Sequence, residues 1–109
     1  MYQISAFYCL TKFDASDLTE IHGLVLRYGT EADLQGLFIV SHEGINATVA
    51  GTEDVIEQFE KLVRSFKGCE EVHFKRSTSE KRPFRRLSVQ IREEAVTIKG
   101  DREYTYDRS

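Results

Sequence analysis

Residues 36–51 read Gly-Leu-Phe-Ile-Val-Ser-His-Glu-Gly-Ile-Asn-Ala-Thr-Val-Ala-Gly. Two apolar runs flank a short polar break that contains Gly44, and glycines close both outer ends. This pattern predicts a β-hairpin with His42 and Glu43 at its tip. The first run is continuously apolar, as expected of a strand that is covered on both faces or nearly so. The second run alternates between two faces, with Ile45, Ala47 and Val49 on one and Asn46 and Thr48 on the other.

The residues before the hairpin predict a strand and a helix. Residues 2–13 are apolar on both faces, which places this strand centrally in a sheet. The helix that follows has Asp14 or Ser16 as its cap, and Gly29 fits the left-handed position at its end. A short polar link over residues 30–35 then leads into the hairpin.

The residues after the hairpin predict a second helix and further strands. Thr52 is the expected helix cap and Gly68 the end, with Glu57, Glu60, Lys61 and Arg64 on the outer face. Residues 72–76 alternate as a short strand, and residues 77–84 form a polar, basic loop. Residues 86–92 alternate as a half-exposed strand. Either of these two segments can serve as the fourth strand of the sheet.

The predicted order is therefore strand, helix, strand, strand, helix, strand, with one further strand to place. This order is typical of the α+β, ferredoxin-like (acylphosphatase-like) split βαβ sandwich, an antiparallel sheet with two helices on one face. At 109 residues the chain is long enough for one domain. We expect this domain over residues 1–100 and a tail or the start of a linker over residues 101–109.

The hairpin also carries a resemblance to a known family. The segment Glu43-Gly44-Ile45-Asn46-Ala47-Thr48 resembles the hairpin of the bacterial rhodanese-related tRNA uridine hydroxylases, which act on the wobble uridine. The similarity extends to Ala6-Phe7-Tyr8 and to residues 83–89, and it concerns the N-terminal domain of that family. Ala47 stands where the family more often has glycine.

The resemblance implies a role as well as a fold. It implies a non-catalytic domain that helps to bind or position tRNA for 5-hydroxyuridine formation. The reactive cysteine of the family belongs to a rhodanese domain further along, which would be a partner of this domain and which residues 101–109 would lead into. The alternative is a structural module that docks on the rhodanese domain without contacting RNA.

The chain is acidic in its first part and basic in its last part, and together with the resemblance this polarity favours a nucleic-acid partner for the basic part. Residues 1–74 carry five basic and twelve acidic side chains, whereas residues 75–109 carry ten basic and six acidic ones. The expected tRNA-binding residues are Lys75, Arg76, Lys81, Arg82 and Arg85, with Phe84 as an aromatic that can stack on an unpaired base. Arg86, beside Leu87, is expected to be partly structural. An ordinary solvated loop, with Phe74 and Phe84 in the core, would have the same composition.

The chain by itself is not expected to catalyse a reaction or to hold a metal or cofactor. Cys9 lies among apolar residues and Cys69 follows a helix end, so both are expected to be reduced structural thiols of a cytoplasmic protein. No apolar run is long enough to span a membrane. The turn over residues 11–16 lacks the glycine and arginine of a phosphate cradle, so an acylphosphatase-like hydrolase is the least favoured alternative.

Overall fold

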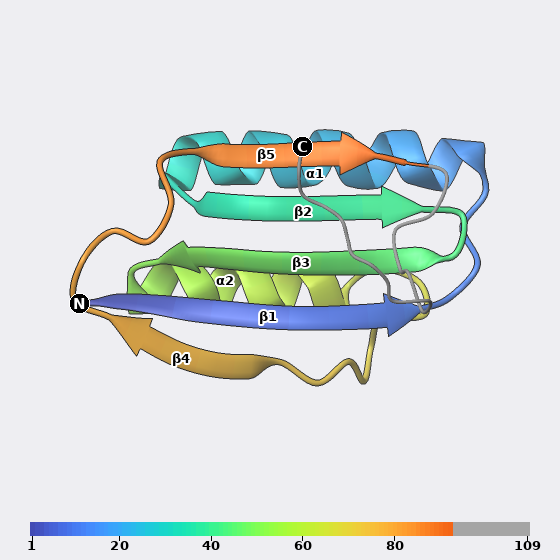
Figure 1. Cartoon of the computed structure of the whole chain (residues 1–109). Coiled ribbons are helices and arrows are strands. Elements are labelled where there is room, and N and C mark those ends of the chain that lie inside the picture. The colour runs from blue at the N-terminus through green and yellow to red at the C-terminus, as the bar shows by residue number, and fades with distance from the viewer. Residues whose placement is uncertain (93–109) are drawn as a thin grey trace.

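The structure, a computed structural model, describes residues 1–92. The tail expected over residues 101–109 and the end of the expected domain therefore lie outside the described residues. Within residues 1–92 seven elements follow one another (Figure 1). They are β1 (Tyr2–Leu10), α1 (Ala15–Ala32), β2 (Gln35–Ser41), β3 (Gly44–Gly51), α2 (Glu53–Arg64), β4 (Lys75–Ser79) and β5 (Leu87–Ile91).

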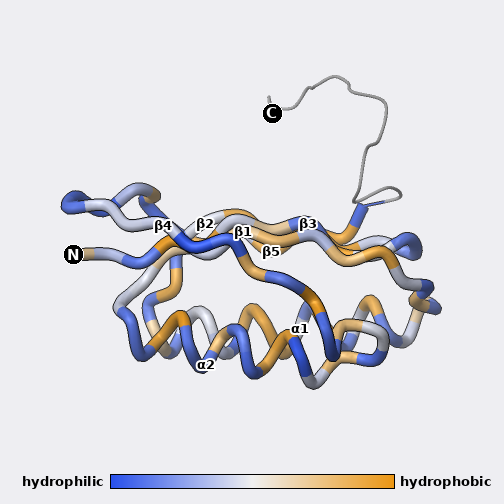
Figure 2. The backbone as a smooth tube through the Cα atoms, turned by 90° about the horizontal axis from the view of Figure 1, so that it is seen from below, coloured by the Kyte–Doolittle hydropathy of each residue, from blue (hydrophilic) through white to orange (hydrophobic). Residues whose placement is uncertain are grey.

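The strands form one sheet in the order β4-β1-β3-β2-β5. The first four of these pair antiparallel, and both helices cover the same face of the sheet (Figure 2). Helix α1 packs on β2 and β5, and α2 packs on β1 and β3. The ferredoxin-like α+β fold is thus confirmed, and a fifth strand extends it. Because β5 pairs parallel with β2, the complete sheet is mixed.

The structure decides which segment is the fourth strand. β4 pairs with β1 from Tyr2↔Ser79 to Ala6↔Lys75, and β5 joins the opposite edge of the sheet. The strand expected over residues 72–76 begins three residues later than predicted, and the first part of the expected basic loop is strand. Hydrophobic alternation could not show this, because all of β4 from Lys75 to Thr78 is exposed and polar.

Helix α1 begins as predicted and ends later than predicted. Asp14 is the N-cap, and its carboxylate accepts a hydrogen bond from the backbone N–H of Asp17. In return the carboxylate of Asp17 accepts a hydrogen bond from the backbone N–H of Asp14, which completes a capping box. The helix continues through Gly29 to Ala32, and Asp33 takes the left-handed position at φ 58°. Gly29 is instead a packing glycine, since a Cβ there would collide with Leu87 of β5. The polar link expected over residues 30–35 is therefore the last turn of the helix and the start of β2.

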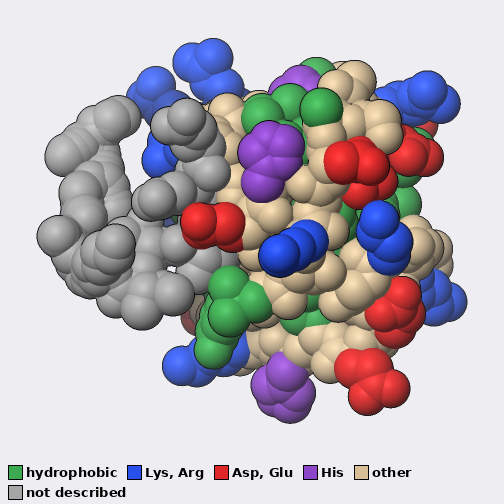
Figure 3. Space-filling view, turned by 90° about the vertical axis from the view of Figure 1, so that its right-hand side faces the viewer, with side chains coloured by type: hydrophobic (Ala, Val, Ile, Leu, Met, Phe, Trp, Pro, Cys, Tyr) green, Lys and Arg blue, Asp and Glu red, His purple; other side chains and the backbone are tan. Residues whose placement is uncertain are grey.

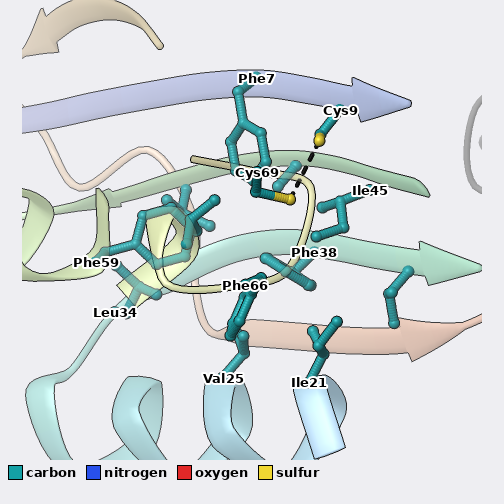
Figure 4. Packing of buried hydrophobic residues seen from close by; sticks show 14 of the residues in the cluster. Phe7, Cys9, Ile21, Val25, Leu34, Phe38, Ile45, Phe59, Phe66 and Cys69 are labelled. Carbon is teal, nitrogen blue, oxygen red and sulfur yellow. Dashed lines mark hydrogen bonds between the residues drawn. The ribbon is translucent and has the colours of Figure 1, made fainter. Parts of the chain in front are cut away.

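The core lies between the sheet and the helices and is centred on aromatic rings (Figure 4). Phe38 contacts Phe7 and Phe59 edge-on, with ring centroids 6.3 and 6.2 Å apart. Cys9 and Cys69 are free, buried and neighbours in this core, with their Sγ atoms 3.1 Å apart. Burial raises the pKa of the Cys69 thiol, which keeps it protonated.

The hairpin between β2 and β3 depends on Gly44. Its φ is +144°, a conformation that residues with a side chain rarely adopt, and a Cβ there would collide with the carbonyl oxygen of Cys9 on β1. Glycine at this position therefore permits the close approach of β1 to β3.

The two glycines Gly44 and Gly23 provide a matched test of this constraint. We expect Gly44→Ala to lower the free energy of unfolding by roughly 2 kcal/mol or more, because it adds both backbone strain and a collision. Gly23 lies within α1 with open space around the position of a Cβ, so Gly23→Ala should raise it by about 0.5–1 kcal/mol. Urea unfolding of both variants measures the difference. Equal midpoints for Gly44→Ala and the wild type would contradict the role given to Gly44.

Candidate nucleic-acid interface

The basic side chains between Lys75 and Arg86 fall into two groups in the structure. Arg76 and Arg82 are held by other residues of the domain. The remaining four are exposed and form no ion pair or side-chain hydrogen bond within residues 1–92: Lys75, Lys81, Arg85 and Arg86. Sequence composition alone could not separate these groups, because the partners of Arg76 and Arg82 lie far away in the chain.

Arg76 faces the helices and is bound by Glu60 of α2. Its Nε donates to Oε2 of Glu60 at 2.7 Å and its Nη2 donates to Oε1 at 3.1 Å. The Ser5 hydroxyl donates to the same carboxylate at 2.7 Å. Glu60 is only 9% exposed, so the prediction that it lies on the outer face of the helix was wrong. The reason is that β1 and β4 bring Ser5 and Arg76 to that side of α2.

The protonation of Glu60 follows from these contacts. Burial acts to raise the pKa of the Glu60 carboxyl, but the hydrogen bonds from Arg76 and Ser5, together with the positive charges of Arg76 and Arg64, outweigh it and hold this pKa below its ordinary value. The hydrogen bonds that Arg76 donates to Glu60 in turn raise the pKa of Arg76. This guanidinium is therefore engaged in joining α2 to the sheet, and we leave it out of the interface proposed below.

Arg82 gives the connection between β4 and β5 its shape. Its guanidinium donates to the carbonyl oxygens of Phe84 and Arg85 at 3.1 and 3.2 Å. It also donates to both carboxylate oxygens of Asp33, the residue that ends α1, at 3.2 and 3.3 Å. The ion pair is exposed and contributes little stability by itself. Its effect is to fasten residues 82–85 against the end of α1.

The two aromatic residues near these cations, Phe74 and Phe84, have different surroundings. Phe74 packs on the core, and its ring centroid lies 5.0 Å from the ring centroid of Phe7. The guanidinium of Arg64 lies over the ring of Phe74, 4.8 Å from its centroid. Phe84 is half-buried on the β4–β5 connection and is not part of the core cluster.

The exposed cations lie at two ends of β4. Lys75 begins β4, whereas Lys81, Arg85 and Arg86 follow its end, so roughly 13 Å of strand separates Lys75 from the other three.

The hairpin residues are divided between the tip and one face of the sheet. At the tip, His42 donates from Nδ1 to the Phe13 carbonyl at 2.8 Å, and the N–H groups of Thr11 and Phe13 donate to the carbonyls of Glu43 and His42, both at 3.1 Å. These bonds hold the tip against the turn after β1. Figure 3 shows this end of the molecule, where described acidic, basic and histidine side chains are interspersed.

The other hairpin residues lie on the face of the sheet that the helices leave uncovered. Asn46 is exposed there and Thr48 is half-buried. Asn46 pairs directly with Tyr8 of β1, which is 65% exposed. The prediction that this strand lies centrally in the sheet is confirmed, since β1 lies between β4 and β3, but its open face is exposed at Tyr8. The alternation of apolar residues placed Tyr8 on one face but could not show that no helix or strand of residues 1–92 covers it there.

A depression of about 720 Å³ adjoins these residues, at the edge of β1 that β4 leaves free. Tyr8, Asn46, Thr48 and Lys75 line it from the sheet. The segment after α2 contributes Gly68, Glu70, Glu71, Val72 and His73. Within residues 1–92 no group of three or more His, Cys, Asp or Glu side chains could hold a metal ion. The same part of the chain has no helix that is long and apolar enough to cross a membrane.

The sequence of this domain matches a known protein family. The model of the UPF0176 acylphosphatase-like domain matches residues 2–95. The chain belongs to this family. The resemblance seen in the hairpin is thereby confirmed, and the chain corresponds to the N-terminal domain of the UPF0176 proteins.

Curated relatives of this UPF0176 domain are named tRNA uridine(34) hydroxylase. The protein from Prochlorococcus marinus (strain MIT 9515) is 33% identical over 97 residues, which are 89% of this chain and 31% of the relative. The protein from Gluconobacter oxydans (strain 621H) is 32% identical over 96 residues, which are 88% of this chain and 30% of the relative. The chain thus spans about a third of the length of these relatives.

Solved structures share the fold of the UPF0176 domain at low sequence identity. A bacterial light-regulated adenylyl cyclase matches with a TM-score of 0.69 and 8% identity, over 84% of this chain and 28% of that one. The BLUF protein BlrB in its dark state matches with a TM-score of 0.67 and 13% identity, over 83% of this chain and 70% of that one. These similarities support the ferredoxin-like architecture alone.

The buried carboxylate of Glu60 leads to a test by pH. Its folded-state pKa lies below the ordinary value of 4.5, so its contribution to stability is present above pH 4.5 and is lost as pH falls below it. We expect Glu60→Gln to lower the free energy of unfolding at pH 7 by about 1–2 kcal/mol, because Arg76 loses its charged partner. The variant should also show a shallower loss of stability between about pH 5 and pH 3.

Glu57→Gln is the matched control, since Glu57 is exposed on the same helix. It should leave both the stability at pH 7 and its pH dependence close to those of the wild type. Chemical unfolding at a series of pH values measures both variants. Equal acid sensitivity in Glu60→Gln and Glu57→Gln would show that the Glu60–Arg76 pair contributes no stability.

Proposed function

We propose that this chain is the non-catalytic N-terminal domain of a rhodanese-related tRNA uridine hydroxylase. In this role it helps to bind or position tRNA in the cytoplasm for 5-hydroxyuridine formation at the wobble position. The family match and the names of the longer relatives support the proposal. The structural observation that carries it is the group of exposed cations on the β4–β5 connection: Lys81, Arg85 and Arg86.

The form of this connection suits a phosphate backbone. Lysine and arginine side chains that neutralise phosphates release condensed counterions, and this supplies much of the affinity for nucleic acids. Arg82 fastens the connection through two of its carbonyls and through Asp33, so its neighbours are presented from a defined backbone. Phe84 lies in the same segment and is half-buried.

Two features of the structure support a non-catalytic role for this domain. A phosphate cradle in the turn after β1 would need backbone N–H groups that are free to bind an anion. Those of Thr11 and Phe13 are already donated to the hairpin tip. The thiols of Cys9 and Cys69 are buried beside each other, and burial of the Cys69 thiol opposes formation of a reactive thiolate.

A docking module that never contacts RNA is the second candidate. The exposed apolar side chains Tyr8, Leu10 and Leu37 favour it, since large apolar groups at a surface often meet another protein. The exposed cations would then face an acidic partner such as the rhodanese domain.

The basic connection is tested by a pair of double variants in the full-length protein. Lys81→Gln with Arg85→Gln should weaken tRNA binding and reduce the slope of log affinity against log salt by up to about 2, because each lost phosphate contact contributes roughly 0.7–0.9. Arg27→Gln with Lys61→Gln makes the same change of charge on the exposed surfaces of α1 and α2. This control should leave the slope nearly unchanged. Binding is measured by titration at several salt concentrations.

Two results would contradict the proposal. Equal weakening by both double variants would mean that only net charge matters. Unchanged binding and modification of tRNA by the Lys81/Arg85 variant would favour the docking module.

A further inference from the structure

We infer that the open face of the sheet around Tyr8 binds one unpaired base of an RNA, with Tyr8 as the stacking surface. This inference deepens the proposed function and rests on it. The site consists of Tyr8 on β1, Asn46 and Thr48 on β3, and Lys75 on β4. It lies at the opposite end of β4 from Lys81 and Arg85 and is therefore separate from the basic connection.

The sheet register brings these four side chains together. Tyr8 pairs with Asn46, Ala6 pairs with Thr48, and Ala6 also pairs with Lys75 on its other side. Because side chains alternate along a strand, all of these residues share one face, and neighbouring strands are only about 4.8 Å apart. Both helices lie on the other face (Figure 2). The site is thus built on three adjacent strands rather than on a loop.

The exposure of Tyr8 is the observation that points to a ligand. Tyr8 lies beyond the last residue of β1 that pairs with β4, it is 65% exposed, and its hydroxyl forms no hydrogen bond to any of residues 1–92. Aromatic side chains presented by a four-stranded sheet are a known means of stacking RNA bases. Ala6, two residues earlier on β1, and Thr48, diagonally across on β3, are small and leave room beside the ring.

The depression beside Tyr8 is large enough for a nucleotide, and polar side chains of the sheet line part of it. Its volume of about 720 Å³ lies within the range typical of small-molecule sites, roughly 300–1,000 Å³. Asn46 offers both a hydrogen-bond donor and an acceptor for the edge of a base, and Thr48 offers a hydroxyl. These groups would bind the edge of a base that is already stacked on Tyr8.

The charges around the depression orient the nucleotide. Lys75 lines it on the side of β4, and Glu70 and Glu71 line it on the side of the segment after α2. A phosphate is attracted by Lys75 and repelled by the two carboxylates. The sugar-phosphate backbone should therefore pass along β4, from where it can continue toward the cations at the other end of that strand.

Stacking is tested in the full-length protein with two substitutions of Tyr8 and two RNA probes. The probes are an anticodon stem-loop and a fully paired duplex of the same stem. Tyr8→Leu keeps an apolar side chain but removes the ring, and it should weaken stem-loop binding by roughly five- to a hundred-fold. Tyr8→Phe keeps the ring and should bind within about twofold of the wild type. Neither variant should alter binding of the duplex, which offers no unpaired base.

Lys75→Gln provides an independent measurement on the same site. It should weaken stem-loop binding and reduce the salt slope by about 0.7–0.9, the effect of one phosphate contact. Thermal unfolding of each variant checks that the fold is retained, as expected for substitutions of exposed residues.

The outcomes separate this inference from the proposed function. If Tyr8→Leu binds the stem-loop like the wild type while the Lys81/Arg85 variant is weakened, the function stands and the stacking site is wrong. Equal loss of stem-loop and duplex binding in Tyr8→Leu would also overturn the site. If RNA binding is unchanged in all variants but Tyr8→Leu lowers the unfolding temperature of the full-length protein, the open face contacts protein. Both the site and the proposed function would then be wrong.

Discussion

The ion pair between Glu60 and Arg76 determines which side chains of β4 face the solvent. Successive residues of a strand point to opposite faces, so a shift of one residue would exchange the two sets completely. With Arg76 bound to a buried carboxylate beneath the sheet, Lys75 must lie on the open face, next to Ala6. The contact between Arg76 and Glu60 thus accounts for two observations. It engages Arg76 within the domain, and it places the cation of Lys75 on the same face as Tyr8.

The position of β5 explains why the basic connection is exposed. The chain leaves β4 at one edge of the sheet and enters β5 at the other, so it crosses four strand spacings, or roughly 19 Å (Figure 1). The eight steps from Ser79 to Leu87 reach at most about 28 Å. A segment this extended has few backbone partners of its own. Arg82 supplies two such partners by donating to the carbonyl oxygens of Phe84 and Arg85. The side chains of Lys81 and Arg85 make no such contact within residues 1–92.

The parts of the structure that sequence reasoning predicted are those with local signals. The hairpin around Gly44, the cap at Asp14 and the order of strands and helices each depend on residues close together in the chain. The errors have long-range causes. Gly29 is a glycine because Leu87 packs on it, and Glu60 is buried because Ser5 and Arg76 reach it. In the same way the cations could be found from sequence, but the exposure of Tyr8 depends on both helices packing on the other face of the sheet (Figure 2) and on β4 pairing with β1 only as far as Ala6.

The separation of charge along the chain becomes a separation in space. Acidic residues of the first part, such as Glu20 on α1 and Glu53 and Glu57 on α2, are exposed on the helices. Among residues 75–86 the exposed cations lie on β4 and on the connection to β5, whereas on the described helices the acidic side chains outnumber the basic ones. A polyanion would therefore be repelled from the helical layer and attracted to the other side, which orients the domain before any contact forms. Electrostatics would set this orientation, and the ring of Tyr8 would distinguish an unpaired base from a helix, because only the former can stack on it.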